Sequence, residues 1–536
     1  MTESHPGRPA DLHRTEPLQD GWELASCAPG ACGTPAEARD AGLAWHRASV
    51  PGTVAGSLGL DLDTSLDLDG LDWWYRCTFP APPRADGEVV RLRFEGLATL
   101  AEVWLNGTRL LESRNMFVPR SCDVPGLRRE GNELAIRFRA LTPELALRRP
   151  RPRWKTALVA HQGRRWFRTT PPGRIPGWPP PPPPAGPGRP LSLERRRRPD
   201  PPRLDPPAQT ARPHGRPPAA RAVRVLDGSR ITGASLRVGP HAFPLVVEAG
   251  PGSFRIAGEA ILAGVPLWWP HTHGDPARLE GALHLETEAG PIAFGCGLLG
   301  FKSVAVDRQE GRVQLVVNGR PVFCRGACWT PIDVRSLEGD PGDLRRMLTL
   351  ARDAGVNLLR VGGTMAYESD AFYTLCDELG ILVWQDFMFA NMDYPFGDPT
   401  FHNEVVEEVD HLLGRLQRHP CLAVYCGGSE IEQQAAMLGL PASEWSGPFF
   451  AEELPRLCAD RHPGIPYFPS TPTEGVLPFH PSAGLAHYYG VRAYRRPLTD
   501  VRLAPVRSTP RCPGLPHVPA PAARVASHGR APPPPP

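Results

Sequence analysis

Short runs in which apolar and polar residues alternate fill the first 145 residues of the chain. Such runs, when Gly, Pro, Asn and Asp turns separate them, are typical of half-buried β-strands. We expect strands at 73–79, 89–96, 101–107 and 132–140. Several short strands in series predict an all-β sandwich, which we assign to residues 1–170.

The composition changes sharply over residues 171–222, where Pro and Arg dominate. Too few apolar side chains are available there to offset the entropy of ordering, and proline cannot donate to a β-ladder. We therefore expect an irregular segment. Alternation resumes at 220–226, 231–239, 242–249 and 281–290, which predicts a second, smaller β-sandwich over residues 223–298.

From residue 299 the period lengthens, and strands alternate with helices. The pattern predicts helices at 341–355, 369–380 and 400–420, and strands at 357–363, 381–390 and 421–428. Parallel βαβ units in series favour a (β/α)8 TIM barrel, in which active groups gather at the C-terminal ends of the strands. With two more strands at 466–472 and 485–491 we count about six of the eight strands that a barrel needs. The sequence thus predicts an incomplete barrel over 299–502 and a disordered Pro/Ala-rich tail over 503–536.

The charge balance limits the classes of partner. Sixty basic and 57 acidic residues give a formal charge of +3, so no global field favours nucleic acid or an anionic membrane. Twelve cysteines are spread along the chain without the paired spacing of a zinc site, and we expect no metal or other cofactor. The N-terminus has no apolar signal region, and no apolar run is long enough to span a membrane. These features predict a cytoplasmic protein whose oligomeric state is left open.

Glu430 follows the predicted strand in "VYCGGSE". A carboxyl at a strand end in a partly desolvated cleft can hold a proton at working pH and act as a general acid. Alternatively, Ser429 and Glu432 have the spacing of a capping box, which would make Glu430 part of the first turn of a helix. The local pattern does not decide between these two alternatives.

Two other strand ends carry charged residues. Asp386 either accepts hydrogen bonds from substrate hydroxyls or caps the next turn, and Arg360 either clamps an active carboxylate or completes a buried ion pair. Aromatic side chains nearby provide flat faces of the kind on which sugar rings stack, although each one could instead belong to the core. They are Trp329, Tyr367, Trp384, Phe389 and Tyr394.

Several separate motifs, in one order along the chain, resemble glycoside hydrolase family 2, and its β-mannosidase branch most closely. They are "LDWWYRCTF" (71–79), "AEVWLNGTRL" (101–110), "LWWPHTHGDP" (267–276), "FCRGACWTPID" (323–333), the segment 358–390 and "VYCGGSE" (424–430). The resemblance implies a multidomain β plus α/β fold. Its parts would be an N-terminal jelly-roll (galactose-binding-like) sandwich, an immunoglobulin-like sandwich and a catalytic TIM barrel.

The resemblance also implies a reaction, the retaining hydrolysis of terminal β-D-mannosides, small or oligosaccharide, by two carboxylates about 5–5.5 Å apart. Glu430 matches the position of the acid/base. Ser429 stands where the family usually has Asn, whose amide can bond the 2-hydroxyl of the sugar. The motifs that line the substrate pocket of the family contain Trp329, Asp333, Arg360, Tyr367, Trp384, Asp386 and His487.

The nucleophile of the family is a Glu expected soon after residues 494–502, but the last Glu of this sequence is Glu474. We therefore expect hydrolysis by this polypeptide to be impaired. Residues 197–222 and 503–536 are rich in Arg, Pro and Ala and interrupt the resemblance abruptly, which is the pattern that out-of-frame translation of a GC-rich gene would give. Two alternative functions remain: another β-glycosidase of the family (galactosidase, glucuronidase or glucosaminidase), or a non-catalytic carbohydrate-binding protein.

Overall fold

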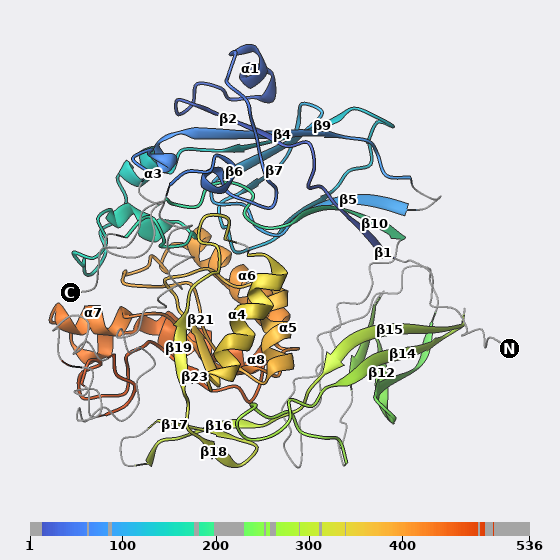
Figure 1. The fold of residues 1–536 in the computed structure, drawn as a ribbon, viewed down its shortest axis with the longest axis vertical. Coiled ribbons are helices and arrows are strands. Elements are labelled where there is room, and N and C mark those ends of the chain that lie inside the picture. Colours follow the sequence, from blue (N-terminus) through green and yellow to red (C-terminus); the bar gives the residue numbers. More distant parts are fainter. Residues whose placement is uncertain are drawn as a thin grey trace.

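The computed structural model describes residues 13–61, 64–83, 88–175, 182–197, 230–250, 253–257, 264–288, 290–309, 313–337, 339–480, 483–487 and 497. In chain order these residues form an antiparallel sandwich, a second antiparallel sheet, a small three-stranded sheet and a parallel sheet with helices (Figure 1). The predictions made for 198–229 and 503–536 lie outside the described residues.

Two antiparallel sheets make up the N-terminal sandwich. The six-stranded sheet has the order β3-β2-β4-β9-β6-β7, and the four-stranded sheet has the order β1-β10-β5-β8. The predicted strands at 73–79, 89–96, 101–107 and 132–140 are confirmed as β4, β5, β6 and β9. The elements are β1 (His13–Pro17), β2 (Glu23–Cys27), α1 (Pro35–Asp40), β3 (His46–Arg47), α2 (Val54–Ser57), β4 (Asp72–Phe79), β5 (Glu88–Phe94), β6 (Ala101–Leu105), β7 (Thr108–Ser113), β8 (Arg120–Asp123), β9 (Asn132–Phe138), α3 (Leu141–Ala146) and β10 (Leu191–Arg197).

Strand β10 corrects the prediction that residues 171–222 are irregular. Its apolar positions Leu191 and Leu193 are buried in the sandwich core, and the strand pairs with β1 on one side and with β5 on the other. Both rows of its backbone groups are therefore hydrogen-bonded. The prediction gave the surrounding prolines too much weight, because a strand of seven residues between two partners does not need a proline-free neighbourhood.

The middle of the chain forms a five-stranded antiparallel sheet with the order β13-β12-β11-β14-β15. Its strands are β11 (Ile231–Val238), β12 (His241–Gly250), β13 (Ser253–Ala257), β14 (Leu279–Thr287) and β15 (Gly290–Leu299). The predicted strand at 220–226 lies outside the described residues, so the second sheet of the expected immunoglobulin-like sandwich stays a prediction. A three-stranded sheet of β16 (Val304–Asp307), β17 (Gln314–Val317) and β18 (Arg320–Val322) follows.

The last sheet is parallel and has the order β19-β20-β21-β22-β23, so the predicted alternation of strands and helices is confirmed for these units. Leu485, in the predicted last strand, makes an antiparallel bridge with Thr473, and closure of the barrel stays untested. The strands are β19 (Gly326–Trp329), β20 (Leu358–Val361), β21 (Leu382–Asp386), β22 (Leu422–Cys426) and β23 (Tyr467–Phe468), and the helices are α4 (Pro341–Asp353), α5 (Asp370–Leu379), α6 (Pro399–Leu416), α7 (Ile431–Met437) and α8 (Leu454–Arg461).

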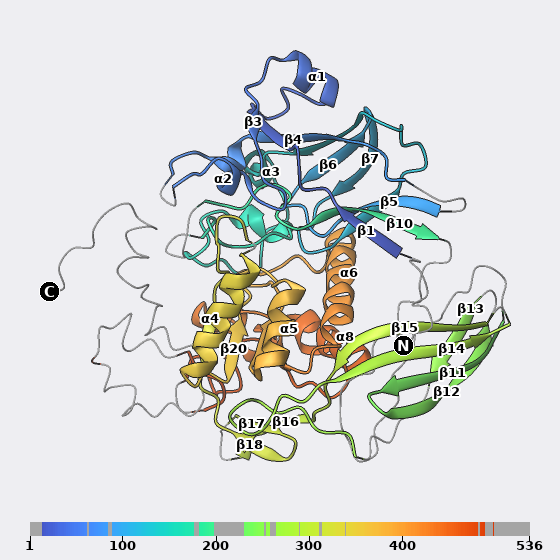
Figure 2. The same cartoon turned by 45° about the vertical axis from the view of Figure 1, so that its right-hand side comes forward.

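The N-terminal sandwich lies over the loops that follow the parallel strands (Figures 1 and 2). The hydroxyl of Thr170 donates to the carbonyl of Met365 at 2.6 Å in the loop after β20. Arg168 forms an ion pair with Glu408 on α6, with 2.7 Å between Nη2 and Oε1, and both side chains are buried. The segment that contains Arg168 and Thr170 therefore contacts both the loop after β20 and α6.

Candidate functional site

Four charged or titratable side chains meet at the C-terminal ends of the parallel strands. Arg360 comes from β20, Asp386 ends β21, Glu430 follows β22, and His487 comes from the segment after β23. All four side chains are buried. Because β20, β21 and β22 are parallel neighbours, their C-terminal ends lie at the same edge of the sheet. This order brings Arg360, Asp386 and Glu430 to that edge, as their positions at strand ends predict.

Arg360 is the centre of this cluster. Its Nε and Nη2 donate to the two oxygens of Asp386 at 3.2 and 2.6 Å. Nη2 also donates to Ser429 Oγ at 3.4 Å and to the hydroxyl of Thr471, and Nη1 lies 3.5 Å from His487 Nε2. Burial opposes the charge on the guanidinium, but the attraction of Asp386 outweighs it and raises the pKa of Arg360 above its ordinary value.

Asp386 is held by neighbours on both sides. Besides Arg360, the indole Nε1 of Trp384 donates to Oδ1 at 3.0 Å, and the backbone N–H of Gly363 donates to Oδ2 at 3.0 Å. These bonds come from β20, from β21 itself and from the loop after β20. The alternative in which Arg360 completes a buried ion pair is therefore what the structure shows, whereas a clamp on an active carboxylate stays a prediction.

Glu430 lies at the junction between β22 and α7 in a left-handed backbone conformation, with φ of +59°. Its N–H donates to the carbonyl of Thr471 at 2.7 Å, and its Oε1 lies 2.9 Å from His487 Nδ1. An imidazole at this distance can exchange a proton with the carboxyl or fix its orientation. Glu430 is thus a buried carboxyl with a titratable partner, which is the arrangement that acid/base chemistry needs.

The alternative based on a capping box is not what the fold uses. Glu430, not Ser429, is the N-cap of α7, and no side chain makes a capping hydrogen bond there. The hydroxyl of Ser429 receives a hydrogen bond from Arg360, while the carboxyl of Glu432 accepts one from Ser446. Both residues of the proposed box therefore face other partners.

Three of the predicted substrate-pocket residues have polar atoms that bind elsewhere. Trp329 Nε1 donates to Glu368 at 2.9 Å, the hydroxyl of Tyr367 donates to Glu408 at 2.8 Å, and Asp333 accepts from the N–H of Arg335 at 2.9 Å. The structure brings together the other predicted residues by hydrogen bonds. These are Arg360, Trp384, Asp386, Ser429, Glu430 and His487.

Two residues that contact the predicted ones were missed by the sequence analysis. Thr471 binds Arg360 through its hydroxyl and Glu430 through its carbonyl, and the strand-end rule applied to 466–472 would have pointed to it. Glu368 holds Trp329, and burial raises the pKa of its carboxyl. No pattern in the sequence distinguishes Glu368 from an ordinary loop glutamate.

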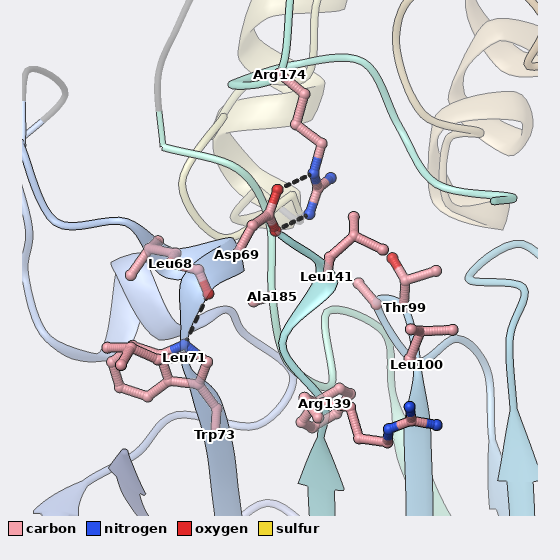
Figure 3. Close-up of a pocket in the computed structure, with 12 residues that line it drawn as sticks. Leu68, Asp69, Leu71, Trp73, Thr99, Leu100, Arg139, Leu141, Arg174 and Ala185 are labelled. Carbon is pink, nitrogen blue, oxygen red and sulfur yellow. Dashed lines mark hydrogen bonds and ion pairs between the residues drawn. The ribbon is translucent and has the colours of Figure 1, made fainter. Parts of the chain in front are cut away.

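A small hollow lies in the N-terminal sandwich, apart from this cluster (Figure 3). At its edge Asp69 accepts from Nε and Nη2 of Arg174 at 2.6 and 2.7 Å, and the indole of Trp73 donates to the carbonyl of Leu68 at 3.0 Å. The polar groups of these residues are therefore already paired within the protein.

The described part of the chain contains no group of three or more His, Cys, Asp or Glu side chains that could hold a metal ion. Nor does any helix within that part have the length and apolar character needed to cross a bilayer.

Comparisons with known proteins cover both halves of the chain. Residues 34–189 match the family model described as the glycosyl hydrolase 2 galactose-binding domain-like family. The chain is 29% identical over 452 residues to beta-mannosidase B of Aspergillus oryzae and 30% identical over 458 residues to that of Thermothelomyces thermophilus. Each alignment covers 78% of this chain and 52% of the relative, so the chain spans about half the length of these curated relatives.

Solved structures share the fold. Beta-D-mannosidase from Dictyoglomus thermophilum superposes with a TM-score of 0.72 at 24% identity, over 92% of this chain and 62% of that chain. The beta-glucuronidase of Ruminococcus gnavus superposes with a TM-score of 0.56 at 13% identity, over 87% of this chain and 73% of that chain.

Proposed function

We propose that this chain, which is similar to β-mannosidases of glycoside hydrolase family 2, has a site built for hydrolysis of terminal β-D-mannosides, with Glu430 as the acid/base. The observation that carries this proposal is the position of Glu430. Its buried carboxyl lies 2.9 Å from His487 Nδ1 at the end of a parallel strand, beside the ion pair of Arg360 and Asp386.

In the proposed mechanism Glu430 donates a proton to the glycosidic oxygen as the bond to the leaving group breaks. His487 and the backbone of Thr471 fix the acid, and the dry surroundings keep water from competing for its proton. Arg360 and Asp386 together carry no net charge, so they position neighbouring groups without opposing the positive charge that develops on the sugar.

The lack of an identified nucleophilic carboxylate is the reason to expect weak hydrolysis. A retaining mechanism requires a nucleophile to form the glycosyl-enzyme, and the 536 residues contain no Glu after Glu474. We propose that this polypeptide hydrolyses mannosides weakly while it keeps the part of the site that binds the sugar.

Two measurements on the 536-residue chain test the function. Calorimetric titration with non-hydrolysable aryl 1-thio-β-glycosides of manno, galacto, glucurono and glucosamino configuration should show preferential binding of the manno compound. Preferential binding of another of these glycosides would mean that the substrate is that sugar and not mannose, within the same family of enzymes. Hydrolysis of 4-nitrophenyl β-D-mannoside should be barely detectable, and robust turnover that Glu430→Gln abolishes would refute the proposed impairment while supporting the role of Glu430.

A non-catalytic carbohydrate-binding function is the second candidate, because the matched family model is described as galactose-binding domain-like. In that case sugar affinity would persist in Asp386→Asn wherever the chain remains folded, since this substitution lies in the parallel sheet and not in the N-terminal sandwich. Loss of sugar binding in Asp386→Asn, with the fold retained by circular dichroism, would favour the hydrolase site.

The predicted cytoplasmic location remains a proposal, which the free thiols among the described cysteines support.

A further inference from the structure

Asn391, in the segment that follows β21, lies next to the segment that carries Glu430. Ala390 forms a parallel bridge with Ser429, and the N–H of Asn391 donates to the carbonyl of Ser429 at 3.1 Å. Asn391 and Glu430 are therefore the two residues that follow the bridged pair, one on each chain segment. The hydrogen bond between the two segments places the backbone of Asn391 beside that of the proposed acid.

Both residues have the left-handed backbone conformation that non-glycine residues rarely adopt. The φ angle is +52° for Asn391 and +59° for Glu430. Asparagine tolerates this conformation better than most residues, but it still carries a cost, and such costs concentrate at sites of function. The conformation is thus a reason to ask what the side chain of Asn391 does.

The carboxamide of Asn391 is exceptional among the buried asparagines. The described residues include four asparagines with 0% exposure, namely Asn115, Asn132, Asn357 and Asn391. In Asn357, for example, Oδ1 accepts from the N–H of Arg325 at 2.8 Å, and Nδ2 donates to the carbonyl of Phe323 at 3.0 Å. Asn115 and Asn132 likewise use both ends of the amide.

In Asn391, by contrast, neither Nδ2 nor Oδ1 has a hydrogen-bond partner within the described structure. Leaving a buried polar group unpaired is costly, and here both ends of one amide are unpaired. Buried polar groups without a partner call for a ligand or an ordered water. A neutral amide that can donate and accept at once matches a sugar hydroxyl, which also donates and accepts.

We propose that Asn391 binds a hydroxyl of the sugar on which Glu430 acts, and so helps to select and position the substrate. This inference rests on the proposed function, because it assumes that a pyranose occupies the site beside Glu430. Asn391 is then a substrate-binding residue that contributes affinity, while the proton transfer remains with Glu430.

The test uses Asn391→Gly in the full chain, because glycine keeps the positive φ while it removes the amide. Asn318→Gly is the matched control: Asn318 also has a positive φ, of +50°, but its side chain donates to the Trp268 carbonyl at 3.0 Å and accepts from the Ser303 N–H at 2.8 Å. Binding of 4-nitrophenyl 1-thio-β-D-mannoside is measured by calorimetry, and stability is measured by urea unfolding.

We expect Asn391→Gly to bind the thiomannoside roughly 5- to 10-fold more weakly than the unaltered chain, without loss of stability. Asn318→Gly should show the opposite result, with lower stability and unchanged binding. Deoxy analogues at each ring hydroxyl identify the partner: one of them should bind weakly to the unaltered chain and lose little further affinity in Asn391→Gly.

Unchanged affinity in Asn391→Gly would overturn this inference alone and would indicate that a water satisfies the amide. An equal loss for all deoxy analogues would also overturn it, because the effect would then be a general distortion of the site. Failure of the unaltered chain to bind any of the four thioglycosides would overturn the proposed function and this inference together.

Discussion

Arg360 and Asp386 form a two-point ion pair between adjacent parallel strands, with 2.6 and 3.2 Å between the bonded atoms and both side chains buried. The pair joins β20 to β21 at the level where the strands end. A buried charge without its partner is costly, so this contact ties the integrity of the site to the stability of the sheet.

Replacement of Asp386 by Ala should therefore destabilise the protein strongly. Arg360 would keep its charge in a dry environment without a carboxylate, and we expect a loss of about 3–5 kcal/mol in the free energy of unfolding. Urea unfolding monitored by tryptophan fluorescence measures this change in the free energy of unfolding. Glu378→Gln is the control, since its partner Arg345 is on the surface, and its unfolding midpoint should stay unchanged. Equal effects of the two substitutions would contradict the burial argument.

The contact between the N-terminal sandwich and α6 should depend on Glu408. This buried carboxylate receives hydrogen bonds from Arg168, Asn115 and Tyr367. Glu408→Gln should cost about 3–5 kcal/mol, because it leaves the buried charge of Arg168 unpaired. It should also expose the junction between the two domains to limited proteolysis.

The neighbouring residue provides the control for that experiment. Glu407 pairs with Arg120 at 2.6 Å, but its side chain is 50% exposed, so Glu407→Gln should change stability by less than about 1 kcal/mol. If both variants resist the protease as well as the unaltered chain does, the buried ion pair does not hold the domains together.

Stability should fall as the pH drops below 6.5, and His462 should contribute to this fall. Burial lowers the pKa of His462 to about 3, whereas the unfolded chain takes up the proton near pH 6.5. The unfolded state therefore binds more protons between these values, and by pH 5 the folded state loses roughly 2 kcal/mol. Urea unfolding at pH 7.5, 6.0 and 5.0 measures the slope.

His462→Gln should flatten that slope, because glutamine does not titrate and can still bond the hydroxyl of Tyr425, which lies 3.0 Å from His462 Nδ1. An identical pH dependence in the variant and the unaltered chain would show that His462 is not the group responsible.

Gly380 should be intolerant of a side chain. It ends α5 with φ of +68°, and a Cβ there would lie 2.6 Å from the backbone N of His271. Gly380→Ala should cost about 1–3 kcal/mol from backbone strain and the clash together. Gly439 follows the C-cap of α7 and has a φ of +83° with open space around it, so Gly439→Ala isolates the strain. If Gly439→Ala lowers the free energy of unfolding as much as Gly380→Ala does, the clash with His271 does not explain the loss.

The sequence by itself determined part of the elements of the fold, although not β10. Period-two alternation identified β4, β5, β6 and β9, and the helical period together with short loops identified α4, α5, α6 and the parallel strands between them. These patterns arise from burial of one face of each element, which is a local property of the chain. Strand order then followed from chain order, so the meeting of Arg360, Asp386 and Glu430 was predictable from their positions at strand ends.

Only the tertiary structure decided which partner each polar group has. The sequence left open whether Glu430 is an acid or belongs to the start of a helix. The structure makes Glu430 the N-cap of α7 and shows no capping box, because Ser429 and Glu432 bond to other residues. The sequence also could not show that the hydroxyl of Tyr367 binds Glu408, or that the amide of Asn391 is buried and unpaired. Hydrogen-bond partners and burial depend on segments far apart in the chain, and no local periodicity encodes them.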